Sequence, residues 1–191
     1  MKKEQYKDCL LNDQIDSKTP KEILARYRLL LGSMAKMESL HSNHDVCDNE
    51  NYHYIAFPPS SFIDILFEGY FLLEGDTSKK FLDVGCGIGT TVLMASNLFD
   101  AYGFDYNQEL VSRAQGVVGD RVCYDDASTF DRYDQFDFIY YYRPFVNDDF
   151  QLQFEERVLN GMKKGALICP VMEALDWESR LERVGEFTYR K

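Results

Sequence analysis

The sequence predicts an α/β fold in which a mostly parallel β-sheet has helices on both faces and an antiparallel element at its carboxyl-terminal edge. Three observations predict it. After residue 76, short apolar runs alternate with longer stretches that repeat apolar residues at helical spacing. Strand and helix alternation of this kind is typical of a parallel sheet covered on both faces. Only twenty residues follow the last apolar run, and they favour a short terminal hairpin.

The first expected elements lie in an amino-terminal arm. A cap that begins at Thr19 opens a helix over residues 19–40, with apolar residues at helical spacing. The polar, turn-rich stretch 41–53 reads as a loop. We therefore expect a helical arm with its loop over residues 1–53 and a main domain over residues 54–191.

The main domain begins with a second helix near Pro58 and continues with alternating strands and helices. The runs expected as strands are Lys80–Val84, Ala101–Phe104, Arg121–Tyr124, Phe136–Tyr141 and Ala166–Val171. The helices expected between them are Thr90–Phe99, Gln108–Val117 and Phe150–Lys163. The hairpin expected at the carboxyl end pairs Glu178–Val184 with Glu186–Arg190.

The composition is that of a folded chain. It is 45% hydrophobic and 15% aromatic, which excludes a disordered or collagen-like protein. No apolar stretch approaches the roughly 20 residues that a membrane helix needs, and the first residues do not form an apolar signal core. Five scattered cysteines without a C-x-x-C pair favour reduced thiols. We expect a cytoplasmic protein with no membrane partner.

The net charge of −11 is unevenly spread. Residues 1–40 hold eight Lys/Arg against six Asp/Glu, a net of +2, whereas residues 41–191 hold 13 against 26, a net of −13. Phosphate backbones attract basic surfaces, so the acidic main domain argues against a nucleic-acid partner.

A glycine-rich turn follows the first expected strand. Gly85, Gly87 and Gly89 form a G-x-G-x-G pattern directly after Asp83. Glycine permits positive φ and lets a ligand approach the backbone, and the start of the next helix offers free N–H groups. Asp105 ends the second strand, twenty residues after Gly85, where a carboxylate can hold two ribose hydroxyls.

The third strand leads to a pair of acids and an alanine. A side-chain carboxylate and a backbone N–H at this point can read the edge of an adenine. Asp126 and Ala127 are the candidates, and Asp125 is an equal rival to Asp126.

These segments resemble the class I S-adenosylmethionine-dependent methyltransferases, which have a Rossmann-like sheet. The resemblance covers roughly residues 57–171. Leu82–Gly89 resembles the family's cofactor loop, and Gly103–Asn107 resembles its ribose-binding strand end. Asp126–Ala127 resembles its adenine-binding pair. Phe136–Tyr140 resembles its fourth strand, and Leu159–Ile168 resembles the approach to its fifth strand.

The resemblance implies S-adenosylmethionine as cofactor and a role for each matching residue. Asp83 would orient the loop or approach the cofactor's amino group. Asp105 would bind the ribose, and Tyr106 would lie against the adenine, whose edge Asp126 and Ala127 would meet. The glycine loop would carry the methionine portion past the backbone. The other residues expected to line the cofactor are Gly85, Cys86, Gly87, Gly89 and Tyr141.

In this family the methyl acceptor faces the end of the fourth strand. Tyr142, Arg143, Pro144 and Phe145 stand where enzymes that methylate exocyclic amines often carry an Asn-Pro-Pro-Tyr tetrapeptide. The amide is absent here, which argues against a nucleobase or glutamine acceptor. Tyr142 and Arg143 are the candidate catalytic residues: the tyrosine can hydrogen-bond or stack on the acceptor, and the arginine can bind a carboxylate or phosphate. Core packing is the alternative role for these side chains.

Two further features precede the first strand. The resemblance implies that the arm helps to cap the cofactor, with Tyr54, Phe57, Pro58 and Ser61 along the edge of the pocket. The polar loop contains all three histidines and one cysteine: His41, His44, Cys47 and His53. We interpret it as a solvated loop, and the alternatives are a metal site or a proton-accepting site. We expect no metal.

The function expected from these features is methyl transfer from S-adenosylmethionine to a small-molecule or protein acceptor. One alternative is a methyltransferase-like binding or partner subunit without activity. Another is a nicotinamide-dependent oxidoreductase, which lacks support because Thr90 stands where the dinucleotide fingerprint has its third glycine.

Overall fold

The computed structural model describes residues 57–191, together with Arg28 and Gly32. Both of these residues are helical, and the Arg28 guanidinium donates to the carboxylate of Asp64. The rest of the expected arm, its loop and the boundary expected after residue 53 lie outside the described residues.

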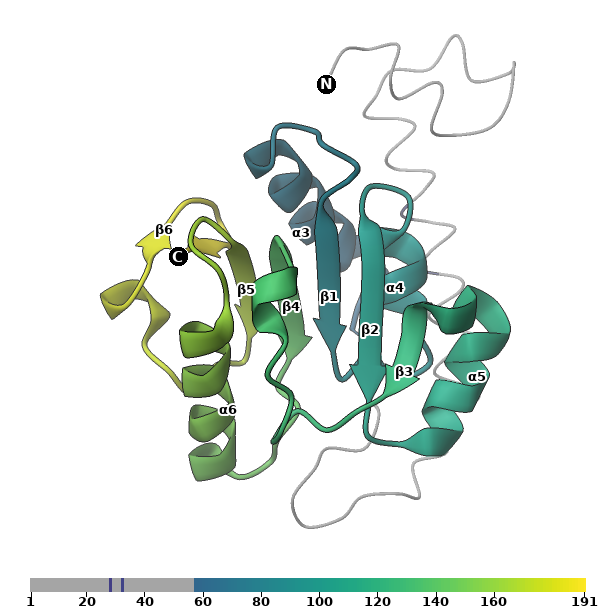
Figure 1. The fold of residues 1–191 in the computed structure, drawn as a ribbon. Helices are drawn as coiled ribbons and strands as arrows, with labels where there is room; N and C mark the ends of the chain where they lie inside the picture. The colour runs from purple at the N-terminus through teal and green to yellow at the C-terminus, as the bar shows by residue number, and fades with distance from the viewer. Residues whose placement is uncertain (1–27, 29–31, 33–56) are drawn as a thin grey trace, which may run out of the picture.

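The core is a seven-stranded sheet with strand order β3-β2-β1-β4-β5-β7-β6 (Figure 1). The first five strands in sequence pair in parallel, β7 runs antiparallel to β5, and β6 antiparallel to β7. The expected parallel sheet with an antiparallel carboxyl-terminal edge is confirmed. The strands, from β1 to β7, are Lys80–Val84, Asp100–Asp105, Val122–Tyr124, Phe138–Tyr142, Leu167–Val171, Glu182–Arg183 and Tyr189–Arg190.

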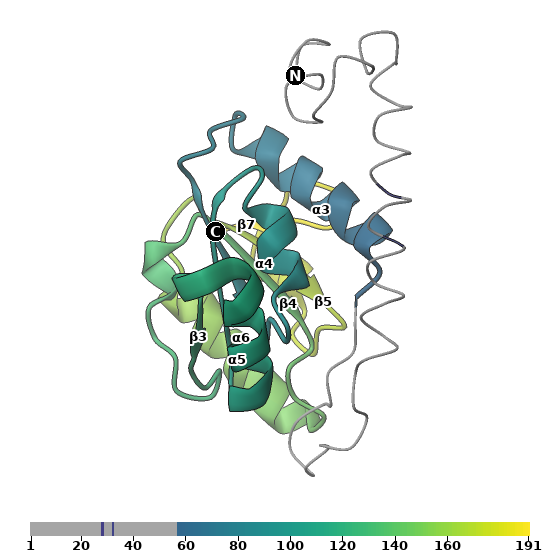
Figure 2. The same cartoon turned by 90° about the vertical axis from the view of Figure 1, so that its right-hand side faces the viewer.

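Helices cover both faces of the sheet, so the central strands are buried on both sides. Phe81 and Tyr140 pack toward α3, α4 and α5, whereas their neighbours Leu82 and Tyr141 pack toward α6. Figures 1 and 2 show α6 on one side of the sheet and α3 and α4 on the other. The α-helices of the main domain are α3 Pro59–Leu72, α4 Thr90–Ala95, α5 Gln108–Val118 and α6 Asp148–Gly161.

Helix α4 is shorter than expected. It ends at Ala95 rather than Phe99, because the Asn97 side-chain amide donates to the carbonyls of Leu93 and Met94, at 3.1 Å each, and closes the last turn.

Helix α6 begins two residues before the expected start. The side chain of Asn147 accepts hydrogen bonds from the N–H groups of Asp149 and Phe150, at 2.8 and 3.1 Å, and caps the helix.

The terminal hairpin is confirmed, although its strands are short. The Glu68 carboxylate of α3 accepts hydrogen bonds from the backbone N–H groups of Glu186 and Phe187, at 2.7 and 3.0 Å, and from the hydroxyl of Thr188. A Cβ at Gly185 would lie 2.2 Å from a Glu68 oxygen, so only glycine fits beneath this carboxylate. Within the part of the chain that the structure describes, no helix has the length and apolar character to cross a membrane.

Candidate functional site

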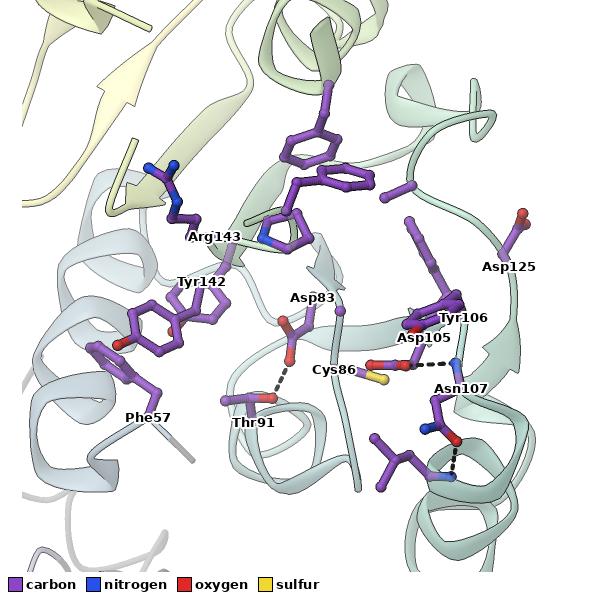
Figure 3. A pocket seen from close by; sticks show the side chains of 18 of the residues that line it. Phe57, Asp83, Cys86, Thr91, Asp105, Tyr106, Asn107, Asp125, Tyr142 and Arg143 are labelled. Carbon is purple, nitrogen blue, oxygen red and sulfur yellow. Dashed lines mark hydrogen bonds between the residues drawn. The ribbon is translucent and has the colours of Figure 1, made fainter. Parts of the chain in front are cut away.

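A cavity of about 470 Å³ opens at the carboxyl ends of the central parallel strands (Figure 3). It lies where the strand order reverses, between β1, which continues through β2 to β3, and β4, which continues to β5. Open α/β sheets bind ligands at this topological switch point. The volume suits a nucleotide-sized ligand.

The glycine loop between β1 and α4 forms one edge of the cavity. The N–H groups of Gly85 and Cys86 both donate to the carbonyl of Phe104, at 2.9 and 3.0 Å, which fixes the loop on the end of β2. Gly85, Gly87 and Gly89 have φ of +77°, +54° and +80°, values that L side chains rarely adopt. Gly85 and Cys86 line the cavity.

Gly87 and Gly89 are not among the residues that line it. Gly87 points its N–H at Asp105, and Gly89 caps α4. A Cβ at Gly89 would lie 3.1 Å from Ala114, so this position serves the packing of α4 against α5.

Asp105 is the carboxylate that joins the loop to the second strand. It accepts hydrogen bonds from the N–H groups of Gly87 and Asn107, at 2.9 and 2.8 Å, and its side chain is only 8% exposed (Figure 3). Burial raises the pKa of Asp105, and the hydrogen bonds from Asn107 and Gly87 oppose that rise. A carboxylate has about four acceptor sites, so Asp105 retains acceptor capacity toward the cavity that it lines.

Asp83 lies deeper, at the end of β1. Its carboxylate accepts a hydrogen bond from the hydroxyl of Thr91 in α4 and faces the cavity (Figure 3). The pKa of Asp83 is raised to about 7, mainly by burial. The Thr91 hydrogen bond opposes this rise, and the nearby charge of Asp105 adds to it. A cation placed beside Asp83 would favour its ionised form.

Tyr140 is a cavity residue that the sequence analysis did not select. It pairs in register with Asp83 across β1 and β4, and it lines the cavity. Its side chain is 1% exposed, and its hydroxyl has no hydrogen-bond partner among the described residues. Burial, first of all, and then the charge of Asp83 hold the pKa of Tyr140 well above its usual value, so the hydroxyl is a neutral donor.

The end of β3 brings Asp125, Asp126 and Ala127 to the opposite side of the cavity. The Asp126 carboxylate accepts a hydrogen bond from the N–H of Ser128 at 2.7 Å. Asp125 accepts from the Asp126 N–H at 2.9 Å and pairs with Arg132 at 2.6 Å. Both acids shape the loop, and both line the cavity.

Tyr142 and Arg143, the candidate catalytic residues, both line the cavity but differ in what they can do there. The Tyr142 ring lies 5.3 Å from that of Phe57, and its hydroxyl makes no hydrogen bond with the described residues. The Arg143 guanidinium pairs with Asp148 and donates to the carbonyl of Met172 at 3.2 Å. It points away from Asp83 and Asp105 in Figure 3. These contacts join the segments after β4 and β5, so Arg143 positions loops and is not a free anion-binding group.

Tyr141 does not line the cavity, which corrects its expected contact with the cofactor. Successive side chains of a strand point to opposite faces, so Tyr141 turns away from the face that bears Tyr140. Its hydroxyl donates to Glu155 of α6 at 2.6 Å and accepts from the indole N–H of Trp177 at 3.2 Å. Glu155, which is fully buried, also accepts from the Ala174 N–H at 3.0 Å. Tyr141 therefore belongs to a buried polar network on the α6 face.

No protein-family model and no curated protein sequence matches the chain. Solved structures do match it. An RNA methyltransferase from Salinibacter ruber, in complex with S-adenosyl-L-homocysteine, superposes with a TM-score of 0.53 at 16% identity and covers 71% of this chain and 92% of its own. An S-adenosylmethionine-dependent methyltransferase from Clostridium acetobutylicum gives 0.52 at 19% identity, with coverage of 72% and 55%.

A third match is an amino pentose methyltransferase from Micromonospora echinaspora, solved with S-adenosylmethionine bound. It gives a TM-score of 0.51 at 18% identity and covers 58% of this chain and 48% of its own. The present chain thus spans about half the length of the second and third of these proteins. The chain has the class I methyltransferase fold.

Two observations on this methyltransferase fold fit S-adenosylmethionine. A Cβ at Gly85 would lie 3.8 Å from the Pro144 Cβ, an ordinary contact distance, so the absence of a side chain leaves room against the backbone. The Tyr140 hydroxyl, which has no partner among residues 57–191, lies in the same cavity as the Asp83 carboxylate. A ligand with an amino acid end and a ribose can satisfy these groups together with Asp105.

The cavity of this methyltransferase fold contains other residues that the sequence analysis missed. Phe57 lines it as expected, whereas Pro58 and Ser61 do not, and Tyr54 and the histidine loop (His41, His44, Cys47 and His53) lie outside the described residues. The missed residues on α6 share one helical face, and their spacing is the signal that could have found them: Phe150, Gln153, Phe154 and Arg157.

Proposed function

We propose that this chain is an S-adenosylmethionine-dependent methyltransferase that binds its cofactor in the cavity at the switch point and methylates a small-molecule or protein acceptor. The observation that carries the proposal is the hydrogen bond from the Gly87 N–H to the Asp105 carboxylate at 2.9 Å. It joins the glycine loop to the acid at the end of β2, the two features that a cofactor with a ribose requires.

Different cavity residues contact different parts of the cofactor. Asp105 accepts hydrogen bonds from the ribose hydroxyls, and Tyr106, which also lines the cavity, lies against the adenine. Asp126 and Ala127 meet the adenine edge. Gly85 and Cys86 leave the backbone open to the methionine portion.

The amino acid end of the cofactor meets the buried polar groups. Asp83 pairs with its ammonium group, and the Tyr140 hydroxyl gains the partner that it lacks among the described residues. A buried donor without a partner costs free energy, so a bound polar group that accepts from Tyr140 stabilises the complex.

The chain's own part in the reaction is to position two molecules and exclude water. When bound, S-adenosylmethionine supplies an electrophilic methyl carbon: the acceptor's lone pair forms the new bond, and the electron pair of the C–S bond passes to sulfur. The thioether leaves without protonation, so no general acid is needed. Tyr142 and Phe145 wall the acceptor end. The acidic main domain favours a small molecule or a basic protein segment over a nucleic acid.

Calorimetric titration of the full chain with S-adenosylmethionine and S-adenosylhomocysteine tests the proposal. We expect micromolar binding of both, lost in Asp105→Ala. The matched control is Asp100→Ala, at the other end of the same strand, where the carboxylate pairs with Arg121 at 3.1 Å. It should leave affinity unchanged. Binding that is equal in the wild type and Asp105→Ala would remove the ribose assignment, and no binding by folded wild type would remove the proposal.

A further inference from the structure

Aromatic rings form the wall of the cavity beside Asp83. The ring of Phe57 lies 6.0 Å from that of Tyr140 and 5.3 Å from that of Tyr142, and Phe62 lies 4.8 Å from Tyr140. All four line the cavity, and Figure 3 shows Phe57 and Tyr142 side by side. The faces of aromatic rings carry negative partial charge and attract cations, most strongly where water is excluded.

The charged group on this wall is also negative. Among the described lining residues contributed by α3, β1 and β4, Asp83 is the charged one. The two arginines of the lining lie elsewhere: Arg143 follows β4 and pairs with Asp148, and Arg157 is on α6. The proposed function pairs Asp83 with the cofactor, so a carboxylate or phosphate placed against the aromatic wall would meet aromatic rings and no cationic side chain among the described lining residues of α3, β1 and β4, whereas an ammonium group would be attracted to the rings.

A third observation points to a polar ligand on the same wall. The Tyr140 residue is buried and lines the cavity, and its hydroxyl, which has no partner among the described residues, meets the amino acid end of the cofactor under the proposed function. Native proteins seldom leave such a group unpaired, so its presence indicates a ligand with a polar atom at this depth. Tyr142, two residues along the same face of β4, has a second hydroxyl without a partner in the described chain, and this hydroxyl is the one that remains for the acceptor.

We propose that the methyl acceptor is a small aliphatic amine, held with its nitrogen against the rings of Phe57, Tyr140 and Tyr142. The inference rests on the proposed function, because a bound amine is an acceptor only beside a bound cofactor. Phenolic and carboxylic acceptors react as anions, which this wall repels. A neutral amine reacts through its own lone pair, which forms the N–C bond as the electron pair of the C–S bond passes to sulfur. The product is an ammonium cation, which the wall stabilises.

The test compares two probes of equal shape and different charge. Choline carries a trimethylammonium group, and 3,3-dimethyl-1-butanol carries a neutral tert-butyl group in its place. Ligand-observed NMR titration of the full chain, with and without S-adenosylhomocysteine, gives a Kd for each probe. We expect the Kd of choline to be at least about fivefold lower than that of the alcohol, the range of a partly desolvated cation–π contact.

Variants separate the ring from its hydroxyl. Tyr142→Leu removes the ring and should abolish the preference for choline, whereas Tyr142→Phe keeps the ring and should retain it. The matched control is Phe71→Leu, a phenylalanine of α3 that is 47% exposed and does not line the cavity. It should leave both Kd values unchanged.

Equal Kd values for the two probes would overturn the inference, and so would a preference that survives in Tyr142→Leu. A failure of the amine inference is distinguishable from a failure of the proposed function. If S-adenosylhomocysteine binds and choline is not preferred, the amine inference alone is wrong. If S-adenosylhomocysteine does not bind while choline is preferred, the cation site stands and the methyltransferase proposal is wrong.

Discussion

The N–H of Gly87 donates a hydrogen bond to the carboxylate of Asp105 at 2.9 Å, across the gap between the glycine loop and the end of β2. This bond and the one from the Asn107 N–H, at 2.8 Å, use part of the acceptor capacity of a buried carboxylate that lines the cavity. The loop and the acid are therefore a preorganised pair, and their geometry does not need to be created by a ligand.

Asp83 should make both stability and ligand binding depend on pH near neutrality. Its pKa in the folded chain is raised to about 7, above the unfolded value of about 3.9, so the folded state binds its proton more tightly. This contribution to stability is fully present below about pH 4 and is lost as the pH rises to 7. Denaturant titrations of the free protein at several pH values should show the decline, and Asp83→Asn should remove it.

Binding of S-adenosylmethionine should show the opposite trend. Its ammonium group favours ionised Asp83, so affinity should rise as the pH increases through 7, with release of a proton. Calorimetry in two buffers of different ionisation enthalpy measures that proton. An affinity that is flat between pH 6 and 8 in the wild type would contradict the pairing of Asp83 with the ammonium group.

Two adjacent tyrosines should respond in opposite ways to loss of the hydroxyl. Tyr141→Phe should destabilise the fold by about 1–3 kcal/mol, because Glu155 and Trp177 lose a buried partner. Tyr140→Phe should leave stability unchanged or higher, since its hydroxyl has no partner among the described residues, but should weaken ligand binding. Urea unfolding measures the first effect and calorimetry the second. Equal destabilisation by both variants would disprove the assignment of faces.

The carboxylate of Glu68 should determine the stability of the terminal hairpin. Glu68→Ala removes the acceptor for the N–H groups of Glu186 and Phe187 and should cost about 1–3 kcal/mol of unfolding free energy. Hydrogen exchange at these two amides should accelerate. Glu186→Ala is the control, because it removes an acid but keeps the backbone donor. Unchanged exchange in Glu68→Ala would show that the hairpin holds without α3.

Arg143→Ala should loosen the acceptor wall without loss of the cofactor. Its guanidinium binds Asp148 and the Met172 carbonyl, and thus holds together the segments that follow β4 and β5. We expect faster hydrogen exchange over residues 144–147 and 172–175 and an unchanged Kd for S-adenosylhomocysteine. A large loss of cofactor affinity would instead indicate that Arg143 contacts the cofactor directly.

The sequence was sufficient to predict the five parallel strands, because each contains a short apolar run. It also located the glycine loop and Asp105, since their spacing follows from one β-α-β unit. The loop residues separate, however, into those that line the cavity, such as Gly85, and those that pack, such as Gly89 against Ala114. That division depends on how α5 packs, which spacing alone does not contain.

The misassignment of Tyr141 has a different cause. Alternation along β4 places Tyr140 and Tyr142 on one face and Tyr141 on the other, but it does not say which face bears the cavity. Pairing of Tyr140 with Asp83 across β1 and β4 settles that question, and pairing is a tertiary fact. The loop-positioning role of Arg143 could not be predicted from the sequence for the same reason: one of its partners, the Met172 carbonyl, is 29 residues away.

The central claim is that the cofactor's ribose lies on Asp105, at the end of β2 beside the glycine loop. A crystal structure of the full chain with S-adenosylhomocysteine tests it most directly. We expect both ribose hydroxyls within about 3 Å of the Asp105 carboxylate, the ordinary hydrogen-bond distance, with the Gly87 contact retained. A ligand whose ribose lies elsewhere in the cavity, or outside it, would contradict the account.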